Sequence, residues 1–148
     1  MIQSKACNKN RHLLAKLLFR VTPVYKYYKY YKKTQWLSRE AIEALQFNRA
    51  KETLELAYKF HVFYKKKFKQ AGVHPTHFKQ LSDLSNFPPV DRKELQNALL
   101  NDEFNLQFVN EPIKQRATTG STGNPFIFPI NQSAFNVRVG CLFRTIVW

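Results

Sequence analysis

A stretch dominated by glycine and hydroxyl side chains constrains this chain more than any other part of its sequence. Residues 116–125 read Arg-Ala-Thr-Thr-Gly-Ser-Thr-Gly-Asn-Pro, so that Gly120 and Gly123 lie among four hydroxyl residues and Pro125 closes the run. Glycine lets the backbone adopt positive φ angles and approach a ligand, and successive N–H groups can then converge on an anion while the hydroxyls add further donors. The stretch predicts a phosphate-holding loop, with an ordinary polar surface turn as the alternative.

The spacing and the flanks of this loop narrow its class. Gly120 and Gly123 are too close for a Walker A loop, no Gly-Lys-Ser/Thr follows, and the three spaced glycines of a dinucleotide-binding loop are absent. The apolar run 126–130 predicts a strand after the loop, and residues 131–133 can cap a helix that continues to Ile146. We therefore expect the loop at the edge of a strand, in an α/β arrangement.

Charge is distributed unevenly along the sequence. The net charge is +14, from 24 Lys and Arg against 10 Asp and Glu, and no acidic residue occurs before Glu40. We treat residues 1–33 as a basic leader rich in Lys and Tyr, and residues 34–148 as the part of a domain that follows it. Such a leader predicts attraction to anionic surfaces, either a membrane or a nucleic acid.

Two segments of the leader sharpen that expectation. Residues 11–21 carry leucines on one helical face with basic residues around it, which is typical of a helix on an anionic membrane or of a peripheral helix docked on the protein. Residues 24–33 combine tyrosines with lysines, a mixture that suits a lipid–water interface or stacking on single-stranded nucleic acid. No RNA-binding motif accompanies them, so the membrane is the favoured surface.

The remaining composition argues for a reducing compartment. Cys7 and Cys141 are too few for a disulfide framework, and no run approaches the ~20 apolar residues of a spanning helix. We expect a cytoplasmic protein, with peripheral contact at the inner face of the membrane through residues 5–33. Because Trp148 falls inside an apolar helical pattern without a stop signal, we also expect the chain to be a fragment.

Helical signals fill the middle of the chain. Ser38 can cap a long helix, or two helices, ending at Ala71-Gly72. Leu81 to Leu84 predicts a brief helical turn before two prolines, and Asp91 with Glu94 has capping-box spacing at the start of a further helix. Residues 101–117 predict a mixed connection. His74 and His77 indicate a loop rather than a zinc site.

The order of these features resembles a known family. The loop from Thr118 to Pro125 fills every specified position of Ser/Thr-Ser/Thr-Gly-Ser/Thr-Thr-Gly-x-Pro, the ATP-gripping loop of adenylate-forming enzymes. Further matching segments precede it in order: Trp36-Leu37-Ser38, Ala44-Leu45-Gln46, Phe63-Tyr64 with Phe68, Ala71-Gly72, and Leu84 to Leu95. Residues 34–148 thus resemble the N-terminal part of phenylacetate-CoA ligase-like proteins, especially the capsular polysaccharide biosynthesis (CapK) branch.

This resemblance implies a fold, a reaction and a site. The fold would be N-terminal helices leading into the first strands and phosphate loop of an incomplete α/β adenylate-forming large domain. The reaction would activate a small-molecule carboxylate as an acyl adenylate with ATP and Mg²⁺, before transfer to a thiol such as coenzyme A. The residues implied in holding the β- and γ-phosphates are Thr118, Thr119, Gly120, Ser121, Thr122 and Gly123.

Two departures limit what the resemblance carries over. Asn124 stands where the ligases commonly have lysine, which removes a cation that Arg116 or Lys114 would have to replace. The adenine-site motifs and the catalytic lysine of the family would lie beyond Trp148, so we expect this segment alone to be inactive and name no catalytic residue within it. The rival of a different class is a non-catalytic basic module that binds an anionic membrane or nucleic acid.

Overall fold

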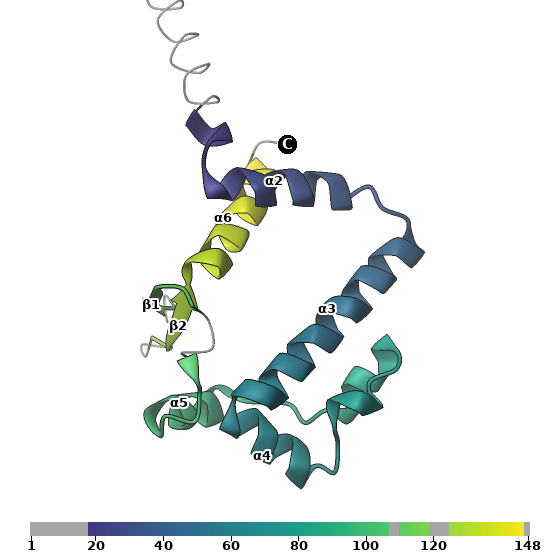
Figure 1. The fold of residues 1–148 in the computed structure, drawn as a ribbon, viewed down its shortest axis with the longest axis vertical. Helices are drawn as coiled ribbons and strands as arrows, with labels where there is room; N and C mark the ends of the chain where they lie inside the picture. Colours follow the sequence, from purple (N-terminus) through teal and green to yellow (C-terminus); the bar gives the residue numbers. More distant parts are fainter. Residues whose placement is uncertain (1–17, 107–109, 119–124, 147–148) are drawn as a thin grey trace, which may run out of the picture. The chain divides into compact units, whose positions relative to one another are not determined.

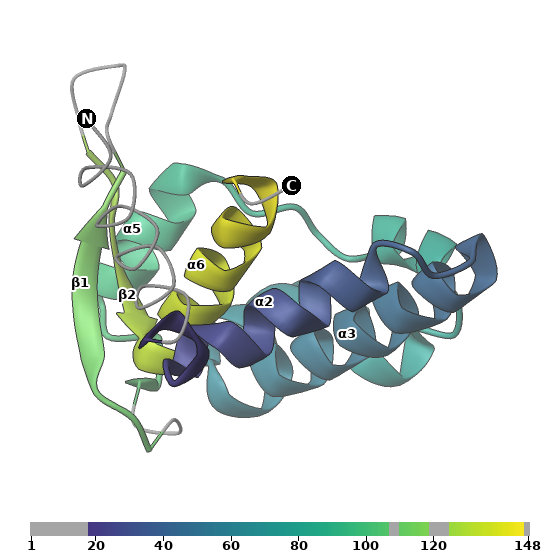
Figure 2. The same ribbon diagram turned by 90° about the horizontal axis from the view of Figure 1, so that it is seen from above.

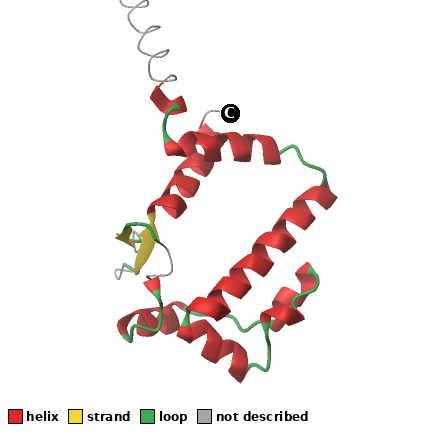
Figure 3. Ribbon diagram, in the orientation of Figure 1, coloured by secondary structure: helices red, strands yellow, loops and turns green. Residues whose placement is uncertain are grey.

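The computed structural model describes residues 18–106, 110–118 and 125–146, and the chain divides into two compact units. One unit consists of residues 38–131, and the other combines residues 1–37 with residues 132–148. Helices dominate the described part of both units, and the strands belong to one short antiparallel pair (Figure 3). This mixture is compatible with the predicted α/β class. The predicted boundary at residue 33 stays a prediction.

Two helices from opposite ends of the chain build the first unit. Helix α2 (Pro23–Thr34) packs against helix α6 (Gln132–Ile146), as Figure 1 shows. Pro23 occupies the first position of α2, where its fixed φ suits a helix, and Thr22 precedes it in an extended conformation. The tyrosines and lysines of residues 24–33 predict a surface segment, but the sequence pattern does not predict the helix that the structure has there. The helix after residues 131–133 was predicted and is confirmed.

Two consecutive helices begin the second unit. The hydroxyl oxygen of Ser38 accepts a hydrogen bond from the Ala41 N–H (3.3 Å), which confirms the predicted cap of α3 (Arg39–Phe60). His61 adopts an extended conformation, with φ −115° and ψ 117°, and separates α3 from α4 (Val62–Gln70). The sequence leaves one helix or two open, and the structure has two. Gly72, with φ +67°, lies just beyond the end of α4, as predicted.

Short helical turns connect α4 to the next helix. The 3₁₀ turns η1 (Pro75–His77) and η2 (Leu81–Asn86) follow α4 and lead to α5 (Arg92–Leu100). The turn predicted around Leu81 is confirmed, and so is the capping box at the start of α5. In η1, the Nδ1 atom of His77 accepts a hydrogen bond from the His74 N–H (3.2 Å), so this histidine pair organises a turn.

The core of the second unit is aromatic. Four buried side chains form it: Leu54, Phe68, Phe78 and Phe87. Phe78 stacks on Phe47 with ring centroids 5.1 Å apart, and Phe68 meets Phe87 edge to face at 5.1 Å. Burial of one such side chain stabilises a fold by about 2 kcal/mol. This core fastens α3 and α4 to the turns that follow them.

A β-hairpin completes the second unit. Strand β1 (Ile113–Ala117) pairs antiparallel with β2 (Ile127–Asn131), and the register runs from Ile113 opposite Asn131 to Ala117 opposite Ile127. Figure 2 shows the two strands side by side. The strand after the glycine loop was predicted and is confirmed. Strand β1 departs from the mixed connection that the sequence predicts for residues 101–117.

Candidate functional site

The glycine and hydroxyl loop connects the two strands of the hairpin. Its two ends are joined by a pair of hydrogen bonds: the Thr118 N–H donates to the Phe126 carbonyl oxygen (2.9 Å), and the Phe126 N–H donates to Thr118 Oγ1 (3.0 Å). We call this pair the loop neck. A hydroxyl that accepts one hydrogen bond keeps its own proton for donation. Thr118 can therefore close the loop and still donate to a ligand oxygen.

The predicted phosphate-holding residues divide between described and undescribed positions. Thr118 lies in the loop neck. Asn124, the residue that differs from the common lysine, lies outside the described residues, and so do the other five: Thr119, Gly120, Ser121, Thr122 and Gly123. The neck therefore gives the position of both ends of the loop, at the tip of a hairpin. The strand predicted after the loop is present as β2, whereas the phosphate-holding roles stay predictions.

The alternation of side chains along the hairpin separates two sets of residues. In a pleated strand, successive side chains point to opposite faces. Gln115 lies opposite Pro129 on one face, while Arg116 lies opposite Phe128 and Lys114 lies opposite Ile130 on the other face. The two cations suggested by the sequence thus share a face of the hairpin, and Arg116 is the nearer of the two to the neck along the chain.

A third cation lies at the exit of the loop. The guanidinium carbon of Arg92 lies 5.8 Å from the centroid of the Phe126 ring, in a cation–π arrangement. Arg92 is the first residue of α5, directly after the cap Asp91. Sequence reasoning missed it, because no loop motif reaches so far upstream and the local pattern around Arg92 indicates only a capping box.

Polar contacts cap the start of helix α5 and join it to α4. Asp91 Oδ1 accepts a hydrogen bond from the Glu94 N–H (2.8 Å), and Glu94 Oε2 accepts one from the Asp91 N–H (3.0 Å). The Lys67 ammonium on α4 donates to Glu94 Oε2 (2.6 Å). The Lys67 hydrogen bond, followed by that of the Asp91 N–H, lowers the pKa of the Glu94 carboxyl. This carboxylate therefore stabilises the fold above its ordinary pKa, and the stabilisation is lost as the pH falls through the lowered value.

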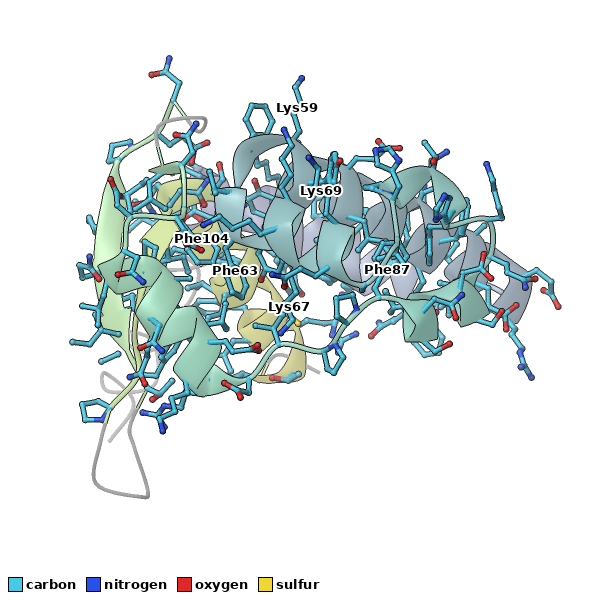
Figure 4. The ribbon with its side chains drawn as sticks, turned by 90° about the horizontal axis from the view of Figure 1, so that it is seen from below. Lys59, Phe63, Lys67, Lys69, Phe87 and Phe104 are labelled. Carbon is cyan, nitrogen blue, oxygen red and sulfur yellow. The ribbon has the colours of Figure 1, made fainter. Side chains whose placement is uncertain are left out.

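Aromatic contacts hold the segment after α5 against α4. The Phe104 ring lies 5.6 Å from that of Phe63, and Lys66 Nζ lies 2.7 Å from Glu103 Oε1 in the same segment. Phe63, Phe104 and Lys67 are labelled in Figure 4. Together with the Lys67–Glu94 ion pair, these contacts connect α4 to both ends of α5.

A cavity of about 630 Å³ lies between α5 and the hairpin, next to the loop exit. Its lining combines apolar side chains with three amides and one lysine: Lys93, Gln96, Asn97, Leu99, Leu100, Leu106, Gln115, Pro125, Ile127 and Pro129. Pro125 is the last residue of the loop motif. The volume falls within the range of ligand pockets, and none of the described lining residues is acidic. The lining suits a neutral or anionic ligand with hydrogen-bonding groups.

Two structural features are absent from the residues that the structure describes. No group of three or more His, Cys, Asp or Glu residues that could hold a metal ion occurs among them. Within the same described ranges, no helix combines the length and the apolar character needed to cross a bilayer.

Comparison with known proteins shows similarity to one kind of enzyme. The chain is 35% identical over 96 residues to the phenylacetate-coenzyme A ligase of Escherichia coli, a match that covers 65% of this chain and 22% of that enzyme. It is 33% identical over 92 residues to the enzyme of the same name from Aromatoleum evansii, and 28% identical over 119 residues to that of Thermus thermophilus. These matches cover 61% and 79% of this chain.

The extent of these matches bounds their meaning. The chain spans 20% to 26% of the length of the curated relatives it matches, which is between about a fifth and a quarter. No protein-family model matches the chain. The identities support kinship with phenylacetate-coenzyme A ligases.

Proposed function

We propose, from this similarity to phenylacetate-coenzyme A ligases, that the chain is the N-terminal part of an ATP-dependent adenylate-forming enzyme that activates a carboxylate. The observation that carries the proposal is the combination of the shared sequence with the loop neck, which fixes both ends of a glycine and hydroxyl loop at the tip of a hairpin. In the proposed reaction, a carboxylate oxygen attacks the α-phosphorus of ATP, and pyrophosphate leaves. A thiol such as coenzyme A then attacks the acyl carbonyl carbon, and AMP leaves.

The loop would act on the leaving group. Negative charge grows on the β- and γ-phosphates as the bond to the α-phosphorus breaks, and fixed N–H and O–H donors stabilise charge at that point more than they stabilise bound ATP. The six residues proposed for this role are Thr118, Thr119, Gly120, Ser121, Thr122 and Gly123. Pro125 would fix the exit of the loop.

Arginines at both ends of the loop offer the charge that Asn124 lacks. Arg116 precedes the neck in β1, and Arg92 lies against Phe126 at the exit. Guanidinium groups match the geometry of phosphate oxygens and are always charged. We propose that these arginines replace the lysine that the ligases commonly have at the position of Asn124.

Magnesium fits this site only together with the nucleotide. The described residues offer no cluster of acidic ligands, and Mg²⁺ in nucleotide sites commonly relies on phosphate oxygens and water with one or two carboxylates. When bound, the ion would reduce the charge on the phosphates. The loop hydroxyls would then orient the phosphates, and the arginines would attract them.

The test is ATP–pyrophosphate exchange by the full-length gene product that contains this chain. Phenylacetate is the first carboxylate to test, followed by other aryl and acyl acids and by sugar acids, since the sequence also resembles the capsular polysaccharide biosynthesis branch. The double variant Ser121→Ala and Thr122→Ala removes two proposed donors and should reduce exchange by about 100-fold or raise the KM for MgATP comparably.

The control makes the same two chemical changes elsewhere. Thr53 and Ser82 are exposed and lie on α3 and η2, and the double variant Thr53→Ala and Ser82→Ala should leave exchange unchanged. Exchange that is equally fast in the Ser121 and Thr122 variant would sink the proposed role of the loop.

A further inference from the structure

The first unit contains no acidic residue. Residues 1–37 and 132–148 carry 11 of the 24 Lys and Arg residues of the chain and none of its 10 Asp and Glu residues. The second unit has the remaining 13 basic residues together with all 10 acidic ones. The excess charge of the protein is therefore concentrated in one structural unit, to which both α2 and α6 belong.

The packing of α2 on α6 determines which face of α2 remains exposed. A methyl group built on Gly140 of α6 would lie only 2.7 Å from the Cβ atom of Tyr27, so the two helices approach closely there. The Phe19 and Phe143 rings add a contact with their centroids 4.8 Å apart. The face of α2 that carries Tyr27 is thus occupied by α6.

The opposite face of α2 carries a stripe of lysines. Lys26, Lys29 and Lys33 follow one another at spacings of three and four residues, which places them on one side of a helix. Lys29 is about 200° around the helix axis from Tyr27. Lys26 borders the Tyr27 side, with its Nζ atom 4.7 Å from the centroid of the Tyr27 ring. The side chains of all three are exposed, and Lys32 is exposed beside them. We call these four residues the lysine face.

Exposed apolar residues flank the lysine face at both ends of α2. Val21 is 81% exposed just before the helix, and Trp36 is 73% exposed just after it. Leu18, at 59% exposure, lies close to Val21 in the chain. Lysines between exposed apolar side chains, with tryptophan at the edge, are typical of surfaces that lie in the headgroup region of a bilayer.

We propose that the lysine face, with Val21 and Trp36, binds the surface of a membrane that contains anionic lipids. Anionic headgroups complement the charge of a unit that has no acid to oppose them, and the hydrocarbon boundary accommodates the valine and the tryptophan. This inference goes beyond the proposed ligase function and does not depend on it.

Exposed aliphatic side chains favour a membrane over a nucleic acid, and two of the α2 tyrosines are packed within the unit. Binding of single strands relies on exposed aromatic rings on which bases stack. Tyr25 and Tyr28 are half-buried, and their rings contact Phe19 with centroids 5.5 and 5.6 Å away. These two rings are therefore packed inside the unit. Val21 is an exposed aliphatic side chain, which would not contribute to binding phosphates or bases but would fit the hydrocarbon boundary of a bilayer.

The first experiment measures binding of the chain to lipid vesicles by cosedimentation. Vesicles of phosphatidylcholine and phosphatidylserine, at about three to one, are compared with vesicles of phosphatidylcholine alone at low and moderate salt. We expect binding to the anionic vesicles only. The triple variant Lys26→Gln, Lys29→Gln and Lys33→Gln should weaken it by about 100-fold, since each lysine near a lipid surface contributes about fivefold.

A matched triple variant separates a specific face from general charge. Lys51, Lys69 and Lys79 are exposed residues of the second unit, and their replacement by glutamine removes the same net charge. This control should bind anionic vesicles almost as tightly as the unchanged chain. Equal weakening by the two triple variants would overturn the proposal, provided that circular dichroism shows both to be folded.

The second experiment reports whether Trp36 enters the interface. The sequence has two tryptophans, so Trp148→Phe leaves Trp36 as the only one. We expect its fluorescence to shift to shorter wavelength with anionic vesicles and to be quenched by brominated lipids. An unchanged spectrum on bound vesicles would refute the proposed orientation. Tight binding of a single-stranded oligonucleotide in the absence of vesicle binding would overturn the proposal and identify a nucleic acid as the ligand of the lysine face.

Discussion

Gly140 shows how one missing side chain can determine the packing of two helices. Alanine has the higher helix propensity by about 1 kcal/mol, so Gly140→Ala would stabilise an isolated α6. In this unit, however, the new methyl carbon would meet the Tyr27 Cβ atom at 2.7 Å and the Tyr28 backbone nitrogen at 3.0 Å. Neither atom belongs to the flexible end of a side chain. We therefore expect Gly140→Ala to destabilise the pairing of α2 and α6 by about 1–3 kcal/mol, despite the gain in propensity.

Thermal unfolding followed by near-ultraviolet circular dichroism checks this expectation, because five of the seven tyrosines of the chain lie in α2 and contribute to the signal. Gly140→Ser is a useful companion, since it has the same Cβ atom and should behave similarly. A variant with alanine at position 140 that is as stable as the unchanged chain would show that α6 can move away from Tyr27 without loss.

Helices α4 and α5 end in the same hydrogen-bond pattern with different residues. Beyond α4, the Val73 N–H donates to the Phe68 carbonyl oxygen (3.0 Å), and Gly72 has φ +67°. Beyond α5, the Glu103 N–H donates to the Ala98 carbonyl oxygen (2.9 Å), and Asp102 has φ 54°. Both are Schellman motifs, in which the left-handed residue is usually glycine.

The two helix ends therefore predict opposite effects of substitution. Gly72→Ala should destabilise the fold by about 1 kcal/mol through the backbone alone, since no atom lies within 4 Å of the added methyl. Asp102→Gly should stabilise it by less than that, because a short polar side chain tolerates the left-handed region. Urea denaturation measures both. Asp102→Asn keeps that tolerance but removes a negative charge from a helix C-terminus, so it isolates the electrostatic part.

At the scale of elements, local signals were readable from the sequence and pairing was not. The caps at Ser38 and Asp91, the stop at Gly72 and the strand after the glycine loop depend on neighbouring residues, and the structure confirms them. Strand β1 was not predicted, because Ile-Lys-Gln-Arg-Ala has only one large apolar residue and forms a strand through its pairing with β2. The position of Arg92 at the loop exit was also not predicted, because it depends on contact with Phe126, which is distant in sequence.

The two units differ in charge, so salt should change their stabilities in different ways. Repulsion between the basic residues of the first unit opposes its folding, and salt screens that repulsion. The second unit instead contains ion pairs, including Lys67–Glu94 and Lys66–Glu103, which salt weakens. Raising NaCl from about 20 mM to about 500 mM should slow amide hydrogen exchange in α2 and α6 by about threefold, and leave exchange in α4 and α5 unchanged or faster.

Hydrogen exchange read by mass spectrometry resolves the two units in one sample. Sodium sulfate also stabilises proteins generally, so NaCl is the appropriate salt for this comparison. A uniform response of all helices would contradict the proposed separation of charge between the units.

The composition of the first unit from both ends of the chain also sets an order of events during synthesis. Residues 38–131 are contiguous, so the aromatic core and the hairpin can form as soon as they have left the ribosome. Tyr27, in contrast, meets its partner Gly140 only after the whole of the second unit has been added. Until then the basic α2 segment lacks the helix that covers its tyrosine face. The second unit can therefore fold before the first unit is complete, although the first unit contains the start of the chain.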